Sequence, residues 1–347
     1  MATLRLLGSL VSIACLAGTG EMVWAEEATA PDATPTATAG AQPSPDELVR
    51  ALVARYEREH KTREWAMLDY MGQRDWESDA VQLARREPVA MQKAVRDGAG
   101  PWSKLVLILG SAGGEKNVAF LVALAEGKIG IPDEVKNSKS FPPEWFLVLA
   151  LGRTRSPEAC PALRTLTEFK EAPEMVPRGV AYQALEALAR IGDLQSVPIF
   201  EKWLASDDAK VRQAAIGAAL YFVGRALAAP LRQVDAQTEG DEKRAQLYLA
   251  LVRAGDETYL EKVHAMAQDE GEYVRGSAMK SPDPAMSVGR PNWTQHNALT
   301  ALEGMRSPKS LPVLDGLAKS AQDDSVKRRA AVLGAEIRKE NGPAKKE

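Results

Sequence analysis

The sequence predicts an all-α fold, a right-handed α-solenoid of about six helix-turn-helix repeats. Six segments align without gaps around one leucine, and an apolar residue stands four positions before each of these leucines. Residues four apart lie on one face of a helix. In four segments a proline stands ten positions after the leucine, where it favours the first turn of a second helix. The anchor leucines are Leu109, Leu151, Leu188, Leu220, Leu251 and Leu302.

The other columns of the alignment predict how each repeat turns and packs. Alanine precedes the anchor in all segments but the first, so a neighbouring helix can approach closely. Gly192 and Gly255 stand in the turn, where glycine readily adopts a left-handed conformation, and Asp193 and Asp256 follow as predicted caps. The column nine residues after the anchor is mostly apolar and includes Cys160. We therefore expect Cys160 to be a buried apolar residue rather than a reactive thiol.

Composition narrows the class of protein. The formal net charge of −3 argues against a nucleic-acid binder, which is usually basic. Hydrophobic residues make up 45% of the chain but aromatic residues only 6%. Alanine and leucine therefore provide most of the burial, which suits closely packed helices better than sheets.

The N-terminus has the pattern of an export signal. Arg5 precedes an apolar run over 6–17 that is too short for a stable transmembrane helix. Small residues at Val23 and Ala25 then predict cleavage after Ala25. Two alternatives stay open: a lipoprotein whose first residue is Cys15, and a retained membrane anchor. We expect a periplasmic or secreted protein without a stable transmembrane anchor.

The rest of the chain divides by composition and repeat pattern. Residues 26–44 are rich in Ala, Thr and Pro, which predicts a disordered tether. The intervals between anchors require insertions at 130–143 and 271–291, and a closing helix is expected over 324–339 with a basic solvent side. The predicted parts are a signal peptide (1–25), the tether (26–44), a divergent helical N-terminal cap (45–100), the repeat array (101–340) with its inserted loop (271–291), and a frayed tail (341–347).

Two segments, 184–215 and 297–318, resemble HEAT repeats of the bacterial kind. The residues that carry the resemblance are the turn pair Gly192-Asp193 and the run Val211-Arg212-Gln213-Ala214-Ala215. Departures occur at the turn Gly113-Gly114 and at Glu261, which replaces the proline. The resemblance implies scaffolding or binding through stacked helices. Some relatives are bilin-attachment lyases, but no motif in this chain implies that activity.

No residue pattern predicts catalysis, a cofactor or a metal. The histidines, His60, His264 and His296, are scattered and fit no metal-binding spacing. The glycines over 110–116 superficially resemble a phosphate-binding loop, but Glu115 separates the last glycine from Lys116 and no strand precedes them. We interpret this segment as a repeat turn, and we expect the protein not to be an enzyme.

The candidate binding residues fall into two sets. Three arginines follow their anchors by two positions and could line one edge of the array to meet acidic partners. The alternative is that cations near helix C-termini simply suit the helix dipole. Aromatic residues could anchor a partner, or could only pack between helices. The candidates are Arg153, Arg190, Arg253, Trp145, Trp203, Tyr221 and Trp293.

These observations predict a non-catalytic exported scaffold that binds a protein or peptide partner. One alternative is an accessory or lyase-like subunit with a small-molecule pocket, which polar residues clustered from two or more repeats would favour. A smooth groove lined by second helices would favour the scaffold. The other alternative is a structural spacer of the cell envelope.

Export can be tested on the mature chain. If cleavage follows Ala25, the intact mass and N-terminal sequencing of the protein from its native cells will show Glu26 as the first residue. A chain that begins at Cys15 and carries lipid would establish the lipoprotein alternative. A chain that still begins at Met1 would contradict both cleavage after Ala25 and the lipoprotein alternative.

Overall fold

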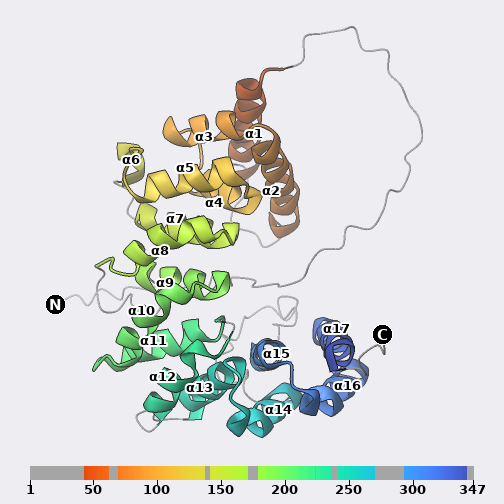
Figure 1. Ribbon diagram of the computed structural model, residues 1–347. Helices are drawn as coiled ribbons and strands as arrows, with labels where there is room; N and C mark the ends of the chain where they lie inside the picture. Colours follow the sequence, from red (N-terminus) through yellow and green to blue (C-terminus); the bar gives the residue numbers. More distant parts are fainter. Residues whose placement is uncertain are drawn as a thin grey trace, which may run out of the picture. The chain divides into compact units, whose positions relative to one another are not determined.

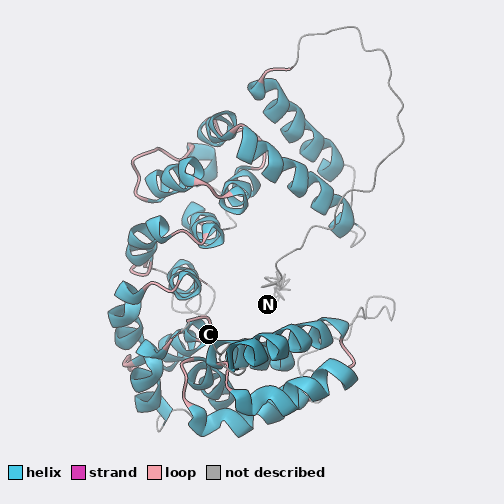
Figure 2. Cartoon of the chain, turned by 45° about the vertical axis from the view of Figure 1, so that its right-hand side comes forward, coloured by secondary structure: helices cyan, strands magenta, loops and turns pink. Residues whose placement is uncertain are grey.

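The repeats form helices that follow one another in chain order, coloured from red to blue in Figure 1. The computed structural model describes residues 43–61, 69–136, 141–170, 179–222, 224–235, 241–269 and 293–341. Regular structure within these ranges is entirely helical (Figure 2), so the predicted all-α solenoid is confirmed. The chain divides after Gln42 into two units, and every described residue belongs to the second. The predicted signal peptide, most of the tether and the 271–291 loop lie outside the described residues.

The N-terminal helices precede the first anchor leucine. Ser44 and Glu47 form a capping box, in which the Glu47 amide donates to Ser44 Oγ at 3.3 Å and the Ser44 amide donates to the Glu47 carboxylate at 2.7 Å. The predicted helical cap (45–100) contains three helices, and Pro88 separates the second from the third. The three helices are α1 (Pro45–Lys61), α2 (Asp69–Arg86) and α3 (Pro88–Arg96).

Each repeat contributes a first helix and a second helix, and the anchor leucine lies in the first helix or, for Leu220, directly after it. The first helices are α4 (Trp102–Ala112), α7 (Pro143–Thr154), α9 (Val180–Ile191), α11 (Ala209–Ala219), α13 (Asp241–Arg253) and α15 (Trp293–Met305). The second helices are α5 (Glu115–Ala125), α8 (Cys160–Leu166), α10 (Val197–Leu204), α12 (Ala228–Asp235), α14 (Leu260–Gln268) and α16 (Leu311–Ser320). The insertion at 130–143 contains the short helix α6 (Asp133–Lys136), and α17 (Asp324–Asn341) is the expected closing helix.

The first helices form a continuous row, because each packs on the next from α2 through α4, α7, α9, α11, α13 and α15 to α17. All six anchor leucines are at most 5% exposed, and Cys160 is 4% exposed as expected. Within the described ranges no helix has the length and apolar content to cross a bilayer. The apolar face of each repeat is therefore buried largely by its neighbours.

The turns follow the predicted chemistry. Gly192 and Gly255 have φ values of 80° and 86°, in the left-handed region. Asp193 accepts a hydrogen bond from the Gln195 amide at 3.3 Å, and Asp256 accepts one from the Thr258 amide at 3.0 Å. The segment 110–116 is confirmed as the turn between α4 and α5, with Gly113 and Gly114 both at positive φ.

The fourth repeat departs from the ungapped alignment. Its second helix, α12, begins at Ala228, eight residues after Leu220, whereas α8, α10, α14 and α16 begin nine residues after their anchors. Ala229, which the alignment placed in an apolar column, is exposed. The interval from the anchor to the second helix is one residue shorter in this repeat, and α11 ends at Ala219, one residue before its anchor. The predicted column is wrong at this position.

A second type of contact joins consecutive repeats through their turns. Arg164 on α8 reaches Asp193 at 2.6 Å, and Arg232 on α12 reaches Asp256 at the same distance. Each turn aspartate thus caps its own repeat and binds the preceding one. Burial alone would raise the pKa of Asp256, but hydrogen bonds from Arg232 and Thr258 outweigh it and hold the pKa below its usual value.

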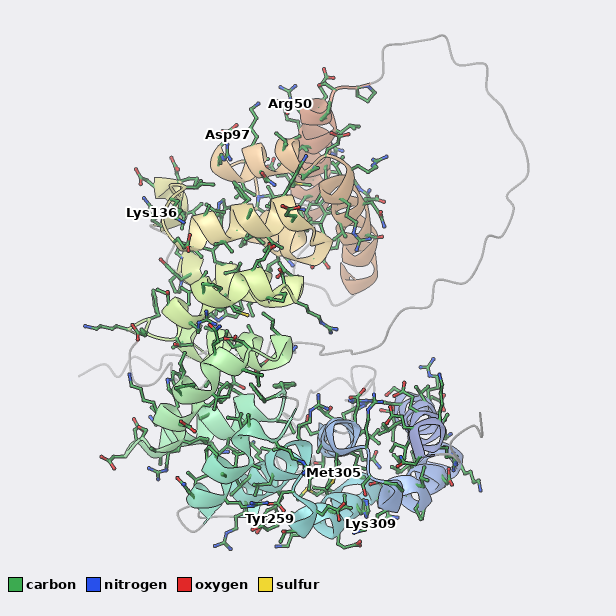
Figure 3. All side chains as sticks on the ribbon, in the orientation of Figure 1. Arg50, Asp97, Lys136, Tyr259, Met305 and Lys309 are labelled. Carbon is green, nitrogen blue, oxygen red and sulfur yellow. The ribbon has the colours of Figure 1, made fainter. Side chains whose placement is uncertain are left out.

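The fifth and sixth repeats are joined differently. His264 on α14 lies with Nε2 3.0 Å from Ser310 Oγ, which belongs to the turn before α16. At the edge of these turns Lys309 also pairs with Glu257 at 2.6 Å (Figure 3, where Lys309 and the neighbouring Tyr259 are labelled). A neutral contact therefore occupies the place where an arginine–aspartate pair joins the earlier repeats.

The expected basic solvent side of the closing helix is only partly correct. Arg329 points inward and donates to Glu303 at 2.9 Å, and Arg338 pairs with Asp315 on α16. Lys327 pairs with Asp324 at 3.3 Å, and Arg328 and Lys339 are exposed. The helix therefore uses part of its charge to attach to the last repeat.

The burial of the anchors leads to a stability prediction. Leu188 is fully buried, so Leu188→Ala should leave a core cavity and lower the free energy of unfolding by about 2–5 kcal/mol. Chemical denaturation measures this change. Leu194→Ala is the matched control, because Leu194 is 68% exposed and should change stability by less than about 0.5 kcal/mol. Equal effects of the two substitutions would contradict the assignment of Leu188 to the core.

Candidate functional site

The three candidate arginines lie near the ends of first helices, but their surroundings differ. Arg153 is exposed and donates to Ser111 Oγ on the preceding first helix at 3.3 Å. Arg190 donates to Glu186 Oε1 at 2.6 Å, and its guanidinium lies 4.1 Å from the ring centroid of Tyr221, which follows the next first helix, α11. Both side chains therefore bridge neighbouring repeats while part of each stays in solvent.

Arg253 corrects the expectation of one exposed column. Its side chain is only 11% exposed, and it donates to the Thr300 carbonyl on α15. A Cβ on Gly304 would come within 2.3 Å of the Arg253 side chain, so α15 leaves room for it only because residue 304 is glycine. Burial lowers the pKa of Arg253, and Arg329 adds to the decrease while Glu303 opposes it. Arg253 is a packed residue at the fifth repeat, not part of an exposed edge.

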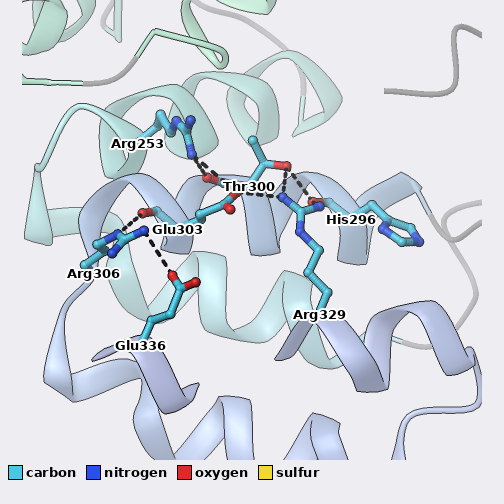
Figure 4. A network of polar contacts seen from close by, with 7 residues as sticks. All are labelled: Arg253, His296, Thr300, Glu303, Arg306, Arg329 and Glu336. Carbon is cyan, nitrogen blue, oxygen red and sulfur yellow. Dashed lines mark hydrogen bonds and ion pairs between the residues drawn. The ribbon is translucent and has the colours of Figure 1, made fainter. Parts of the chain in front are cut away.

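Arg253 belongs to a polar network between α13, α15 and α17 (Figure 4). Arg329 donates to the His296 carbonyl at 3.1 Å and to Thr300 Oγ1 at 2.8 Å, in addition to Glu303. Arg306 donates to Glu336 at 3.0 Å from the other side. The carboxylates and carbonyls of the network are occupied by these guanidinium groups. The network therefore attaches the closing helix α17 to the last repeat.

The described aromatic candidates are partly buried. Trp145 stacks on Phe141 with ring centroids 4.7 Å apart, and Trp203 packs against the core of the middle repeats. Tyr221 lies beneath Arg190. The side chain of Trp293 lies outside the described residues. Packing between helices therefore accounts for much of each described ring, as the alternative interpretation expected.

The middle repeats carry a hollow that the sequence did not predict. It has a volume of about 350 Å³ and lies over α11, between Tyr182 on α9 and Gln246 on α13. Three consecutive first helices therefore contribute to it. Its complete lining is Tyr182, Ala209, Lys210, Gln213, Ala214, Gly217 and Gln246. We call the surface formed by these residues, together with Glu186, Arg190 and Tyr221, the first-helix face.

The polar groups of the first-helix face are arranged in pairs. Gln213 Nε2 donates to Gln246 Oε1 at 2.6 Å, which joins α11 to α13. Tyr182 interacts with Glu186, one helical turn further along α9. Burial, reinforced by the charge of Glu186, raises the pKa of Tyr182 well above its usual value, so its hydroxyl stays protonated. The face can therefore donate and accept hydrogen bonds at fixed positions.

Other candidate chemistry in the described residues is structural. Burial raises the pKa of the Cys160 thiol. No group of three or more His, Cys, Asp or Glu side chains within the described ranges is placed to hold a metal ion. His264 contacts Ser310, and His296 lies with Nε2 3.2 Å from Ser325 Oγ, so both stabilise the last repeats. The side chain of His60 is outside the described residues.

The solenoid of stacked two-helix repeats defines a known class of protein. Residues 144–221, from α7 through Tyr221, match the family model described as HEAT repeats. This part of the chain therefore consists of HEAT repeats, as the resemblance of its motifs indicated. No curated protein matches the chain.

Three solved structures are similar to this chain at low identity. Human deoxyhypusine hydroxylase in complex with glycerol is 14% identical over 75% of this chain and 98% of that one, with a TM-score of 0.29. The complex of CpcE and CpcF of phycocyanin lyase from Nostoc sp. PCC7120 is 17% identical over 89% and 100%, with a TM-score of 0.39. The archaeal HEAT-like repeats protein from Thermococcus onnurineus NA1 is 14% identical over 86% and 99%, with a TM-score of 0.30.

The histidine contacts predict a pH dependence of stability. Burial lowers the pKa of both His264 and His296 in the folded chain, partly opposed by Glu261 and Asp323 respectively. The unfolded chain, with ordinary histidine pKa values near 6.5, then binds more protons than the folded chain as the pH falls. The stability that depends on these histidines should be fully present above about pH 7.5 and decrease as the pH falls through about 6.5.

Thermal melts of the parent and of a His264→Gln/His296→Gln variant measure this dependence. The variant should lose less stability than the parent between about pH 7.5 and pH 5.5, because Gln does not titrate. Parallel curves for the two proteins would show that these histidines do not control the response.

Proposed function

We propose that this chain is a non-catalytic exported scaffold that binds a protein or peptide partner through its first-helix face. HEAT repeats are a scaffold fold, and repeat arrays use extended surfaces for binding. The observation that carries the proposal is the hollow over α11, to which three consecutive repeats contribute. A partner lying along the row of first helices contacts the same type of surface in each repeat.

Two features of the face support a macromolecular partner. Arg153 and Arg190 are exposed cations on α7 and α9, the two first helices that precede α11 in the chain. Tyr221, held under Arg190, is an aromatic side chain of the kind enriched at interaction hot spots. Cationic and aromatic groups therefore occur together beside a preformed depression, which favours recognition of a partner with acidic character.

A second candidate is an accessory subunit with a small-molecule pocket. The clustering of Tyr182, Gln213 and Gln246 from three repeats favours it, because polar groups converging on one hollow are typical of ligand sites. Native mass spectrometry of the chain isolated from its own cells distinguishes the two. A retained compound of defined mass would favour the pocket, and a retained polypeptide would favour the scaffold.

Site-specific photo-crosslinking tests the proposed face directly. The photoreactive residue p-benzoylphenylalanine replaces Lys210 at the rim of the hollow, or Lys202 on the second helix α10 as a matched exposed control. In living cells, position 210 should give a discrete polypeptide adduct and position 202 should give none. An adduct at both positions, or at 202 alone, would contradict binding through the first-helix face. Cross-linking at neither would contradict the scaffold proposal.

A further inference from the structure

We propose that the hollow over α11 binds an extended acidic peptide segment of the partner, with an apolar side chain in the hollow and an acidic side chain two residues away at Lys210. This inference rests on the proposed function and specifies the chemistry of the partner. It follows from the shape of the hollow, from its paired amides and from its charge.

The shape of the hollow comes from small residues on α11. Ala209, Ala214 and Gly217 lie along the helix where larger side chains would fill the space between α9 and α13. A Cβ on Gly217 would make ordinary van der Waals contact with Tyr182 alone, at 3.5 Å from its hydroxyl and 4.0 Å from Cε2, so Tyr182 forms the wall of the hollow beside this glycine. The floor of the hollow is apolar, so an aliphatic side chain of the peptide can be buried there.

The glutamine pair supplies the polar recognition. One amide of Gln213–Gln246 donates to the other at 2.6 Å, which leaves one free carbonyl and one free amino group beside the hollow. This remains true whichever way the two amides are oriented, because each orientation uses one donor and one acceptor. A peptide group also offers one donor and one acceptor. The pair therefore matches the backbone of an extended polypeptide and does not require a particular side chain.

The charge of the first-helix face indicates where the bound peptide carries its acidic residue. Glu186 is compensated by Arg190 at 2.6 Å, and the Asp208 carboxylate is engaged in capping α11, where it accepts from the Lys210 amide at 2.7 Å. Lys210 is the charged residue among the described residues that line the hollow, and it is exposed. Lys210 stands one helical turn before Ala214, about 5–6 Å along α11. In an extended peptide, residues two apart point to the same side and are roughly 7 Å apart. An apolar residue above Ala214 thus places the side chain two positions away near Lys210.

Peptide selection on the full chain tests the inference. A phage-displayed library of random seven-residue peptides is selected against the immobilised protein, and the affinity of enriched peptides is measured by fluorescence anisotropy. We expect enrichment of an aliphatic residue two positions from Asp or Glu. Changing that acid to its amide should weaken binding about two- to fivefold, because Lys210 is exposed, and Lys210→Glu should weaken binding further because it replaces an attraction with a repulsion.

Two glycine variants locate the binding site. Gly217→Met fills the hollow without displacing backbone and should weaken binding at least tenfold. Gly316→Met on α16 is the matched control, because a Cβ there meets nothing within 4 Å, and it should leave the affinity unchanged. Thermal melts of both variants verify that they fold.

The outcomes separate this inference from the proposed function. Enriched peptides that lack the acidic residue but depend on Gly217 would overturn the inference and leave the first-helix face as the binding surface. Enriched peptides that bind Gly217→Met as tightly as the parent would overturn both. If no sequence is enriched while position 210 still forms a polypeptide adduct in cells, the peptide chemistry proposed here is wrong.

Discussion

The structure depends on the fact that no repeat can bury its own apolar face. The anchor leucines and the residues four before them lie at the junction between consecutive first helices, and they are buried because each helix packs on the next. Burial by neighbours fixes the order of the repeats. Because apolar packing is not directional, it does not by itself prevent one alanine-rich first helix from sliding along the next. The turn contacts, such as Arg164 with Asp193, restrict that sliding because each carboxylate binds both its own turn and the preceding helix.

The difference between burial by neighbouring repeats and contacts between their turns explains which parts of the fold the sequence could predict. Anchor columns, turn glycines and capping aspartates are local or periodic features, so their pattern in the sequence predicted the structure around Leu188 and Gly192 correctly. The one-residue shift of the fourth repeat was missed because Leu220 and Ala219 are both apolar, and an ungapped alignment accepts either as the anchor. The contact between Arg232 and Asp256 could have been found in the sequence. Once the fourth repeat is shifted by one residue, Arg232 on α12 aligns with Arg164 on α8, which makes the same contact with Asp193.

The candidate site was harder to predict than the fold, for physical reasons. Arg253 occupies the same column as Arg153 and Arg190, yet it is buried because the next first helix has glycine at position 304 and so leaves room for its side chain. A column within one repeat carries no information about the residue that faces it. The hollow over α11 was missed for a related reason. It results from small side chains at Ala209, Ala214 and Gly217, and in a sequence these look like ordinary helix-forming or packing residues.

The distribution of polar groups along the array favours the middle repeats as the place of binding. At the C-terminal end, the guanidinium groups of Arg306 and Arg329 are engaged by carboxylates and carbonyls of α15 and α17, so a partner there would have to displace buried or half-buried ion pairs. Over α11 the amide pair retains a free donor and a free acceptor, and the adjacent hollow is already formed. Binding at that place requires little rearrangement of the repeats. The same stacking that makes the array stable therefore also prepares its first-helix face for a partner.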